Sequence, residues 1–356
     1  MARYLPGCLE SLVGRDDVEV LVVDDGSKDG TAAVAESFRD RFGDRLRVVR
    51  KANGHYGSCV NAAIPLARGL YFKTLDADDS FDRAAFAAFL DRIAESARAG
   101  IEPDAWLTDY AEEDELSGPR PEVRLGLATD RAVGLGEIVS LATLPTVHSF
   151  AYRTRFLSGI GYRQTEGQPY TDNEFILYPL LKAREIRYAP LSVYRYRTGR
   201  EGQSVSFESR RRNYWAYGTL LYRMLDFRRG PEGAALAGDA LAYFERNRVG
   251  MARQYLETLF FLSPYGAFER ELPEFVRRVE TAEPGLYAAV EEDARILKSI
   301  LPIRYLRVWR KLPFGRRAWV WFARASVRAT SAIAARKNRV KRTDEPKGGE
   351  GKEKAT

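Results

Sequence analysis

Residues 71–79 read YFKTLDADD, and this stretch decides the expected fold. Aromatic and apolar side chains open it, as in a short buried strand, and three carboxylates close it. In a parallel α/β sheet, ligands bind in the crevice outside the carboxyl ends of the strands. Asp76 and Asp78 are two residues apart, so in extended backbone both would point to one side, while Asp79 would point away. The stretch predicts an α/β enzyme whose ligand lies against paired carboxylates.

Such a pair is typical of a site for a hard divalent cation. Mg²⁺ or Mn²⁺ accepts one or two protein carboxylates and completes its coordination with water and substrate phosphate oxygens. Asp76 and Asp78 are therefore the expected metal ligands, and the ligand that they imply is phosphorylated. The alternative is that Asp78, Asp79 and Ser80 only cap the helix that begins near Asp82, because Asp and Ser are favoured helix caps.

A second acidic strand end lies upstream. Residues 20–27 read VLVVDDGS, which predicts a buried strand that delivers Asp24 and Asp25 to its exit. The turn GSKDGT, residues 26–31, then starts a helix expected over residues 31–42. Carboxylates at such a position bind ribose hydroxyls or base N–H groups strongly. The alternative is that these acids only stabilise the turn. We expect the two acidic strand ends to share one crevice.

Five motifs together resemble the family 2 glycosyltransferases, which are nucleotide-sugar-dependent enzymes of the GT-A fold. The motifs are VVDDGSKDGT at 22–31, NGHYGSCVN at 53–61, LDADD at 75–79, YTDNEF at 170–175 and YRYRTGREGQS at 194–204. Their order and spacing are specific, and the likeness is firmest over residues 3–90. The resemblance implies a Rossmann-like, mostly parallel central sheet flanked by helices, followed by a helical C-terminal region.

The resemblance also implies roles for individual residues. Asp76 and Asp78 would hold the ribose and a divalent metal on the diphosphate of the donor, with a UDP-sugar as the first expectation. Residues expected to contact the nucleotide sugar are Asp24, Asp25, Asn53, Gly54, Asn61, Asp76 and Arg200. Arg200 lies in the glycine-containing turn 199–203, which is expected to close over the diphosphate as a lid. The alternative for this turn is a solvated surface loop.

The motif YTDNEF implies the catalytic base. Asp172 matches the base of the family, and Glu174 is the alternative, because Thr171 replaces the Glu that is usual before the Asp. A sugar hydroxyl is a poor nucleophile, so an inverting transfer needs one carboxylate within hydrogen-bond reach of it. The expected reaction is a metal-dependent, inverting sugar transfer to a hydroxyl of a glycan or lipid-linked acceptor, in cell-surface polysaccharide synthesis.

The composition is that of a globular protein with an uneven charge distribution. Of the 356 residues, 45% are hydrophobic and 29% are charged, and the net charge is +7. Residues 304–342 contain thirteen Lys and Arg and no acid, so the rest of the chain is mildly acidic. The two cysteines show no spacing pattern, which favours a reducing compartment. No apolar run is long enough for a standard transmembrane helix.

The basic segment 304–342 also carries aromatic residues. Arg317, Arg324 and Arg328 are expected on one helical face, and Trp319, Phe322 and Ile333 on another. Basic amphipathic helices with Trp and Phe favour an anionic membrane surface. The expected location is cytoplasmic, and peripheral on the inner face of the cytoplasmic membrane. The alternatives are a helix packed on the rest of the protein and a nucleic-acid patch, although no nucleic-acid partner is expected.

Pattern and composition divide the chain into four expected parts. They are a GT-A catalytic domain over 1–205, a helical region over 206–302, the basic aromatic segment over 303–342 and a disordered tail over 343–356. Residues 3–12 resemble the helix that follows the first strand of the family. We therefore expect the true start about ten to fifteen codons upstream, the size of one strand and turn.

Two other functions stay open at this stage. Residues 76–80, DADDS, superficially match the strand end of haloacid-dehalogenase-like phosphohydrolases, but that function leaves residues 24–27 unexplained. The other is a non-catalytic, membrane-docked scaffold that keeps the fold without activity. Release of nucleoside diphosphate from a nucleotide sugar, release of orthophosphate from a phosphoester, or a failure to bind nucleotide would distinguish the three.

Overall fold

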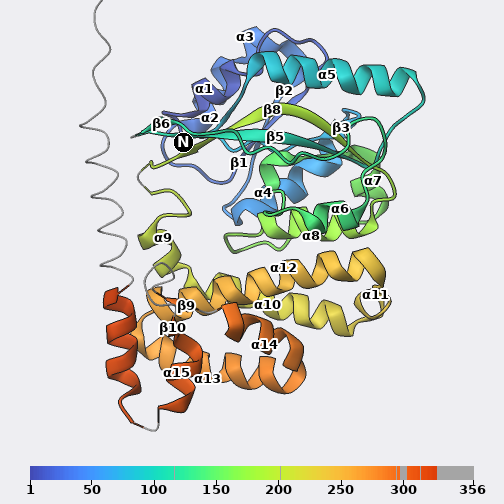
Figure 1. Cartoon of the computed structure of the whole chain (residues 1–356). Helices are drawn as coiled ribbons and strands as arrows, with labels where there is room; N and C mark the ends of the chain where they lie inside the picture. Colours follow the sequence, from blue (N-terminus) through green and yellow to red (C-terminus); the bar gives the residue numbers. More distant parts are fainter. Residues whose placement is uncertain (116, 201, 294, 297–302, 313, 327–356) are drawn as a thin grey trace, which may run out of the picture. The chain divides into compact units, whose positions relative to one another are not determined.

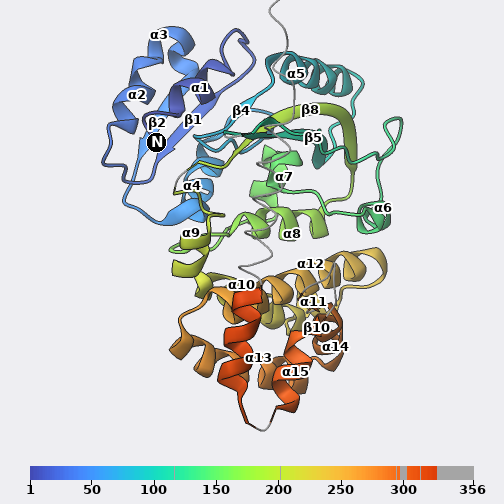
Figure 2. The same cartoon turned by 60° about the vertical axis from the view of Figure 1, so that its left-hand side comes forward.

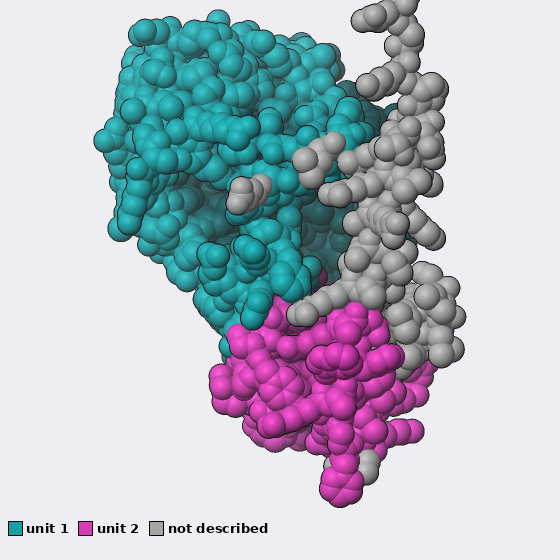
Figure 3. Space-filling view, turned by 90° about the vertical axis from the view of Figure 1, so that its left-hand side faces the viewer, with its two compact units in different colours: residues 1–248 teal, residues 249–356 magenta. Residues whose placement is uncertain are grey.

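The structure is a computed structural model that describes residues 1–326 except 116, 201, 294, 297–302 and 313. The chain divides into two compact units, an N-terminal unit of residues 1–248 and a C-terminal unit of residues 249–356 (Figure 3). The division falls inside a long helix, α12 (Gly238–Glu257), so the helices between residues 206 and 237 group with the N-terminal unit. The expected tail over 343–356 lies outside the described residues.

The N-terminal unit contains two sheets (Figures 1 and 2). β1 and β2 form a parallel pair, and the larger sheet has the order β3-β7-β5-β8-β4 with β6 paired to β5. In the larger sheet only β5 and β8 pair in parallel. The strands are β1 (Val20–Asp24), β2 (Leu46–Arg50), β3 (Tyr71–Phe72), β4 (Ser80–Phe81), β5 (Ala105–Asp114), β6 (Gly118–Pro119), β7 (Phe150–Arg153) and β8 (Ile186–Thr198).

The α/β class is therefore confirmed, but the expectation of a mostly parallel sheet is wrong, because the sheet is mixed. Parallel pairing needs a long crossover, which the chain provides between β5 and β8. The connection from β5 to β6 is only a short turn, and a short turn permits antiparallel pairing alone.

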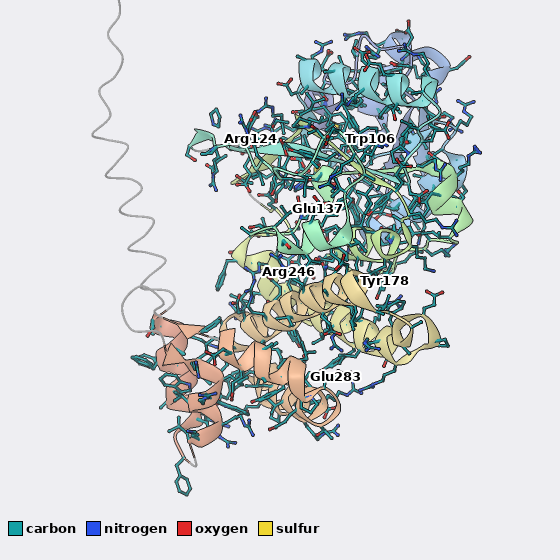
Figure 4. The ribbon with its side chains drawn as sticks, turned by 45° about the vertical axis from the view of Figure 1, so that its right-hand side comes forward. Trp106, Arg124, Glu137, Tyr178, Arg246 and Glu283 are labelled. Atoms are coloured by element: carbon teal, nitrogen blue, oxygen red, sulfur yellow. The ribbon has the colours of Figure 1, made fainter. Side chains whose placement is uncertain are left out.

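Helices cover both faces of the larger sheet, with α5 on one face and α4, α7 and α8 on the other (Figures 1 and 2). Phe86 and Phe89 of α5 are buried, and Phe89 meets the indole of Trp106 edge to face. Trp106 belongs to β5 and is labelled in Figure 4. The helices of this unit are α1 (Leu5–Glu10), α2 (Thr31–Ser37), α3 (Arg39–Phe42), α4 (His55–Ala63), α5 (Arg83–Arg98), α6 (Leu135–Ser140), α7 (Thr154–Gly159), α8 (Asp172–Lys182), α9 (Phe207–Arg212), α10 (Tyr214–Arg229) and α11 (Pro231–Ala234), followed by α12. The helix expected over 31–42 is thus two helices that meet at Phe38.

The acidic stretch is a turn rather than the end of an extended strand. β3 stops at Phe72, and the Asp79 N–H donates to the Asp76 carbonyl at 2.9 Å. The expectation that extended backbone aligns Asp76 with Asp78 is therefore wrong. The cap of α5 is Asp82 and not a residue of the acidic stretch, because the Asp82 side chain accepts the Ala85 N–H at 2.9 Å. The Asp residues at 76, 78 and 79 are thus not needed as helix caps.

The C-terminal unit is helical over the residues described in it. Its helices are α13 (Tyr265–Ala282), α14 (Pro284–Asp293) and α15 (Tyr305–Lys311), with a further helix over 316–326 and a short pairing of β9 (Arg295–Ile296) with β10 (Ile303–Arg304). Phe260 packs edge to face on Phe268 and also contacts the ring of Tyr305. No helix in the described part of the chain combines the length and apolar character needed to cross a bilayer.

A loop of residues 164–167 ties α4 to α8. The Asn61 side chain donates to the Gln164 carbonyl and accepts from its N–H, both at 2.8 Å. The Gly167 N–H donates to the Gly54 carbonyl at 2.8 Å. On the other side, the loop is held by α8, where Glu174 accepts the N–H of residue 165 at 2.6 Å. The first turns of both helices are therefore connected through one short loop.

Within this connection, α4 and the loop of residues 164–167 approach each other closely at Gly57. A Cβ at residue 57 would lie well inside contact distance of the Thr165 carbonyl oxygen, and backbone cannot swing away as a flexible side chain can. We expect Gly57→Ala to lower the free energy of unfolding by about 2 kcal/mol, as overpacking does, in a urea titration. Gly7 is the matched control, because it is also the third residue of a helix and a Cβ there meets nothing within 4 Å. Gly7→Ala should keep or raise stability, and equal effects of the two substitutions would contradict this account.

Candidate active site

Four carboxylates and one guanidinium form a cluster at the 76–79 turn and the start of α8. Asp76, Asp78 and Asp79 belong to the turn, Asp172 is the first residue of α8, and Arg200 follows β8. The charges of the other three carboxylates act on the Asp76 carboxyl, and the charge of Arg200 opposes them. Four residues that the sequence singled out, at 76, 78, 172 and 200, therefore lie in one cluster, which we call the acidic cluster.

Asp79 holds the turn onto β8. Its carboxylate accepts the Tyr194 hydroxyl at 2.6 Å and the Arg197 N–H at 2.7 Å, and only 2% of the residue is exposed. The same Tyr194 hydroxyl accepts the Asp76 N–H at 3.1 Å. Burial is the largest influence on the Asp79 carboxyl and raises its pKa to about 7, although both hydrogen bonds lower it. Asp79 is thus a structural member of the cluster.

Asp78 is paired with the predicted lid. Its carboxylate accepts a hydrogen bond from the Arg200 guanidinium, and its carbonyl accepts one from the Arg197 guanidinium at 2.9 Å. Both guanidinium groups lie over the ring of Tyr4, at 5.4 Å for Arg197 and 5.7 Å for Arg200. Gly199 and Gly202 on either side of Arg200 have positive φ, which glycine adopts without strain. The turn 199–203 therefore folds onto the acidic cluster.

Asp76 and Asp172 carry the carboxylates in the cluster that are least engaged. The described residues provide no hydrogen bond to the Asp76 carboxylate. The Asp172 carboxylate accepts the Asn173 side-chain amide at 3.4 Å and interacts with the backbone N–H groups of Asp172 and Asn173. Burial is the main reason that the pKa of the Asp76 carboxyl lies well above its usual range, and the neighbouring carboxylates raise it further. Burial likewise raises the pKa of Asp172. In both residues the charged form of the carboxyl group is disfavoured, and its oxygens can accept further hydrogen bonds.

Glu174, the alternative base, is fully occupied. Its carboxylate accepts the Thr165 N–H at 2.6 Å, the Thr165 hydroxyl at 2.7 Å and the Arg223 guanidinium at 3.2 Å. The residue is only 5% exposed. Asp172 has no comparable set of partners. The geometry therefore gives Glu174 the task of holding the loop of residues 164–167 and leaves Asp172 available for a ligand.

Asp25 connects the end of β1 to the start of α4. One of its oxygens accepts the Lys51 ammonium at 2.7 Å, the Gly54 N–H at 2.9 Å and the Ser58 hydroxyl at 3.3 Å. Burial raises the pKa of the Asp25 carboxyl, but the bond from Lys51 and that from Gly54 outweigh it, so the net shift is downward. Asp25 is therefore a stable carboxylate at the strand end.

The other residues predicted to contact the nucleotide sugar differ in whether their side chains already have hydrogen-bond partners within the protein. Asp24 is buried and accepts the Ser27 N–H at 2.9 Å, which is the turn-stabilising alternative. Asn61 uses its amide on the loop of residues 164–167, where it also donates to Glu166 at 2.8 Å. Asn53 is exposed at the start of the loop before α4. The structure thus gives Asp24 and Asn61 internal partners and leaves Asn53 open to solvent.

Tyr56 is a site residue that the sequence analysis missed. Its hydroxyl is buried and lies near the Thr74 side chain, without a hydrogen bond of standard geometry among the described residues. Burial raises its pKa well above the usual range, and the charges of Asp76 and Asp172 add to this effect. Tyr56 is the second residue of α4, two residues before the Ser58 that contacts Asp25. The first turn of α4 therefore lies between Asp25 and the acidic cluster, as a shared crevice requires.

The acidic cluster fits a divalent cation by its donor chemistry. Carboxylate oxygens suit Mg²⁺ and Mn²⁺, and the excess of negative charge around Asp76 is what a cation would relieve. No group of three or more His, Cys, Asp or Glu side chains in the described part of the chain is arranged to hold a metal ion.

Comparisons with known proteins place these observations in a family. Residues 2–105 match the model of glycosyl transferase family 2. The putative glycosyltransferase EpsH of Bacillus subtilis is 31% identical over 117 residues, which are 32% of each chain. Chondroitin synthase of Escherichia coli is 34% identical over 94 residues, which are 26% of this chain and 14% of that protein. The matched segment thus spans a third or less of the length of these curated relatives.

A solved structure shares the fold over most of the chain. The S. aureus TarS 1–349 structure in complex with UDP-GlcNAc superposes with a TM-score of 0.53 and 20% sequence identity, covering 93% of this chain and 88% of that one. The matched segment includes both acidic stretches, at 24–25 and 76–79. Residues 2–105 are therefore similar to glycosyl transferase family 2, and the chain shares the fold of TarS 1–349.

Proposed function

We propose that this protein transfers a sugar from a nucleoside-diphosphate donor to a hydroxyl of a glycan or lipid-linked acceptor, with inversion. The observation that carries the proposal is the acidic cluster, in which the buried carboxyl groups of Asp76 and Asp172 lie near the ion pair of Asp78 with Arg200. The family match supports the reaction class. Because TarS is described with UDP-GlcNAc, UDP-sugars are the first donors to test.

Asp172 is proposed as the general base. The acceptor hydroxyl loses its proton to the Asp172 carboxylate while its oxygen forms a bond to the anomeric carbon of the donor sugar. The bond from that carbon to the diphosphate breaks, and the nucleoside diphosphate leaves with the electron pair. The raised pKa of Asp172, caused by burial, makes the carboxylate a better proton acceptor than an exposed Asp.

Asp76 is proposed as a ligand of Mg²⁺ or Mn²⁺, with Asp78 as the second. When bound, the cation would stabilise the charge on the departing diphosphate by several kcal/mol as a Lewis acid. Asp78 now pairs with Arg200, so it can bind a cation only if that pair opens. We propose that Arg200 then moves to the diphosphate, because the planar guanidinium can donate two hydrogen bonds to phosphate oxygens. The buried Tyr56 hydroxyl is placed to donate to a donor or acceptor oxygen in the same crevice.

Asp25 is proposed to receive the nucleoside, with Gly54 and Asn53 beside it. Its carboxylate is kept ionised by Lys51, so it suits the N–H and hydroxyl donors of a base or ribose. Asp24 and Asn61 would support this pocket through the turn and the loop of residues 164–167, since their side chains have internal partners. The phosphohydrolase alternative still leaves this second acidic strand end without a role.

A thermal-shift screen of nucleotide sugars with Mn²⁺ tests the proposal directly. A donor that binds only the folded state raises the apparent stability, by about 2.7 kcal/mol at a hundredfold excess over its Kd. The expected result is a shift with one nucleotide sugar and release of its nucleoside diphosphate when acceptor is added. Orthophosphate release from a generic phosphoester would favour the phosphohydrolase instead, and no shift with any nucleotide would favour the scaffold.

The base assignment predicts different effects for two neighbouring carboxylates. Asp172→Asn should lower turnover at least a hundredfold, the scale of lost general-base catalysis, with donor affinity and stability retained. Glu174→Gln is the matched control and should lower the free energy of unfolding by about 1–2 kcal/mol, since it weakens a buried hydrogen-bond set. Steady-state kinetics and urea titrations measure both effects. The reverse pattern would make Glu174 the base.

The pairing of Arg200 with Asp78 predicts opposite effects on two ligands. Arg200→Gln should strengthen Mn²⁺ binding in the absence of donor, because it frees Asp78 from its ion pair. The same change should weaken binding of nucleoside diphosphate by about tenfold, the value of one charged hydrogen bond. Calorimetric titrations of the two ligands measure this. A variant that weakens both, or neither, would show that Arg200 does not exchange partners.

A further inference from the structure

The helix over 316–326 turns one face inward and leaves another uncovered in the described structure. Val320 and Ala323 are 1% and 0% exposed, and the Trp319 indole N–H donates to the Tyr305 carbonyl at 3.1 Å. Arg324 also faces inward, because its guanidinium donates to the Phe260 carbonyl at 2.7 Å. The alternative of a helix packed on the protein is thus partly realised. Arg317 and Arg324, which are expected on one helical face, both contact α13, through Glu269 at 2.9 Å and the Phe268 ring at 5.7 Å. Arg328 and Ile333 lie outside the described residues.

The outward side carries large aromatic residues. Phe314, in the turn before the helix, is 87% exposed, Trp321 is 74% exposed and Phe322 is 43% exposed. Phe314, Trp321 and Phe322 form what we call the aromatic face. Trp321 and Phe322 follow Val320 directly, so the helix that buries Val320 necessarily directs them away from the inward side. Burying side chains of this size from water is strongly favourable, so the sequence here is unlike that of an ordinary solvated helix.

Uncompensated cations lie next to the aromatic face. Lys311 and Arg316 are exposed, and the described residues provide no ion pair to either. Arg316 instead stacks on the Trp309 ring, at 4.8 Å, and donates to the Leu312 carbonyl. Arg317 differs, because Glu269 pairs with it at 2.9 Å. Further along the sequence, residues 327–342 add six Lys and Arg and no acid. Aromatic side chains beside excess positive charge match an apolar layer beneath anionic headgroups.

We propose that the aromatic face inserts into the surface of an anionic phospholipid membrane, with Lys311 and Arg316 on the headgroups. Phe, Trp and basic side chains in one amphipathic segment are the composition of interfacial membrane anchors. A second protein copy accounts less well for the face, because it would bring the same positive charges together. The inference does not rest on the proposed transfer reaction, since it concerns binding alone.

The test is sedimentation of the full chain with vesicles of phosphatidylcholine mixed with phosphatidylglycerol, compared with phosphatidylcholine alone. The unaltered protein should bind the anionic vesicles and lose binding as salt rises. Replacing Phe314, Trp321 and Phe322 together by Ser should weaken binding about tenfold or more. Lys311→Gln with Arg316→Gln should also weaken binding about tenfold and remove most of the preference for phosphatidylglycerol.

The matched control replaces three other exposed apolar residues, Val205, Phe207 and Trp215, which are 52%, 51% and 40% exposed. This variant should bind like the unaltered protein, and an equal loss would overturn the proposal. A second readout uses vesicles with brominated acyl chains, which quench tryptophan that enters the bilayer. Quenching of the unaltered protein should largely disappear in Trp321→Phe, and unchanged quenching would count against the aromatic face.

Other occupants of the aromatic face give different results. A dimer in sedimentation velocity that the triple Ser variant converts to monomer, without vesicle binding, would assign the face to a second copy. If Trp321 is shielded from acrylamide without lipid, the protein covers the face itself, and the proposal fails. The expected result is a monomer whose Trp321 is quenched by acrylamide and protected when anionic vesicles are added.

Discussion

Repulsion between the carboxylates of the acidic cluster is the physical constraint on which the site depends. Asp76, Asp78, Asp79 and Asp172 would drive one another apart if the chain did not oppose their charge. Tyr194 and Arg197 of β8, and Arg200 after it, reduce this repulsion by hydrogen bonds and an ion pair to the carboxylates. Two of these partners hold Asp79, and the third holds Asp78. Among the described residues, Asp76 and Asp172 have no such charged partner, and burial raises the pKa of both carboxyl groups, where a cation and a reacting hydroxyl are proposed to bind.

The same constraint explains why elements far apart in sequence must be locked together. The first turn of α4 lies between Asp25 and the acidic cluster. The loop of residues 164–167 connects α4 to α8, because it contacts Gly54 before the helix, Asn61 within it and Glu174 of α8. A small displacement of α8 relative to α4 would separate the proposed base from the proposed nucleotide pocket. Catalytic groups need positions held within a fraction of an ångström. The partly buried hydrogen bonds of Asn61 and Glu174 are proposed to provide that precision.

Much of this arrangement follows from local sequence, and the remainder depends on long-range contacts. Apolar strands that end in acid predicted β1 and the site residues, because strand periodicity and charge are visible along the chain. The turn at 76–79 was not predictable in this way, since it is fixed by Tyr194, more than a hundred residues away. The same holds for Asn61, whose partner is Gln164, and for Arg324, whose partner is the Phe260 carbonyl. Sequence motifs thus located the chemistry but did not distinguish ligand contacts from internal supports.

The central claim is that a divalent cation and a diphosphate bind together at the acidic cluster. Calorimetric titration of UDP into the protein, in Mn²⁺ and in excess chelator, tests it most directly. The account predicts binding that is at least about tenfold tighter with Mn²⁺, because the cation uses both carboxylate and phosphate oxygens as ligands. Equal affinity under the two conditions would contradict the account, since the carboxylates would then repel the diphosphate with nothing between them.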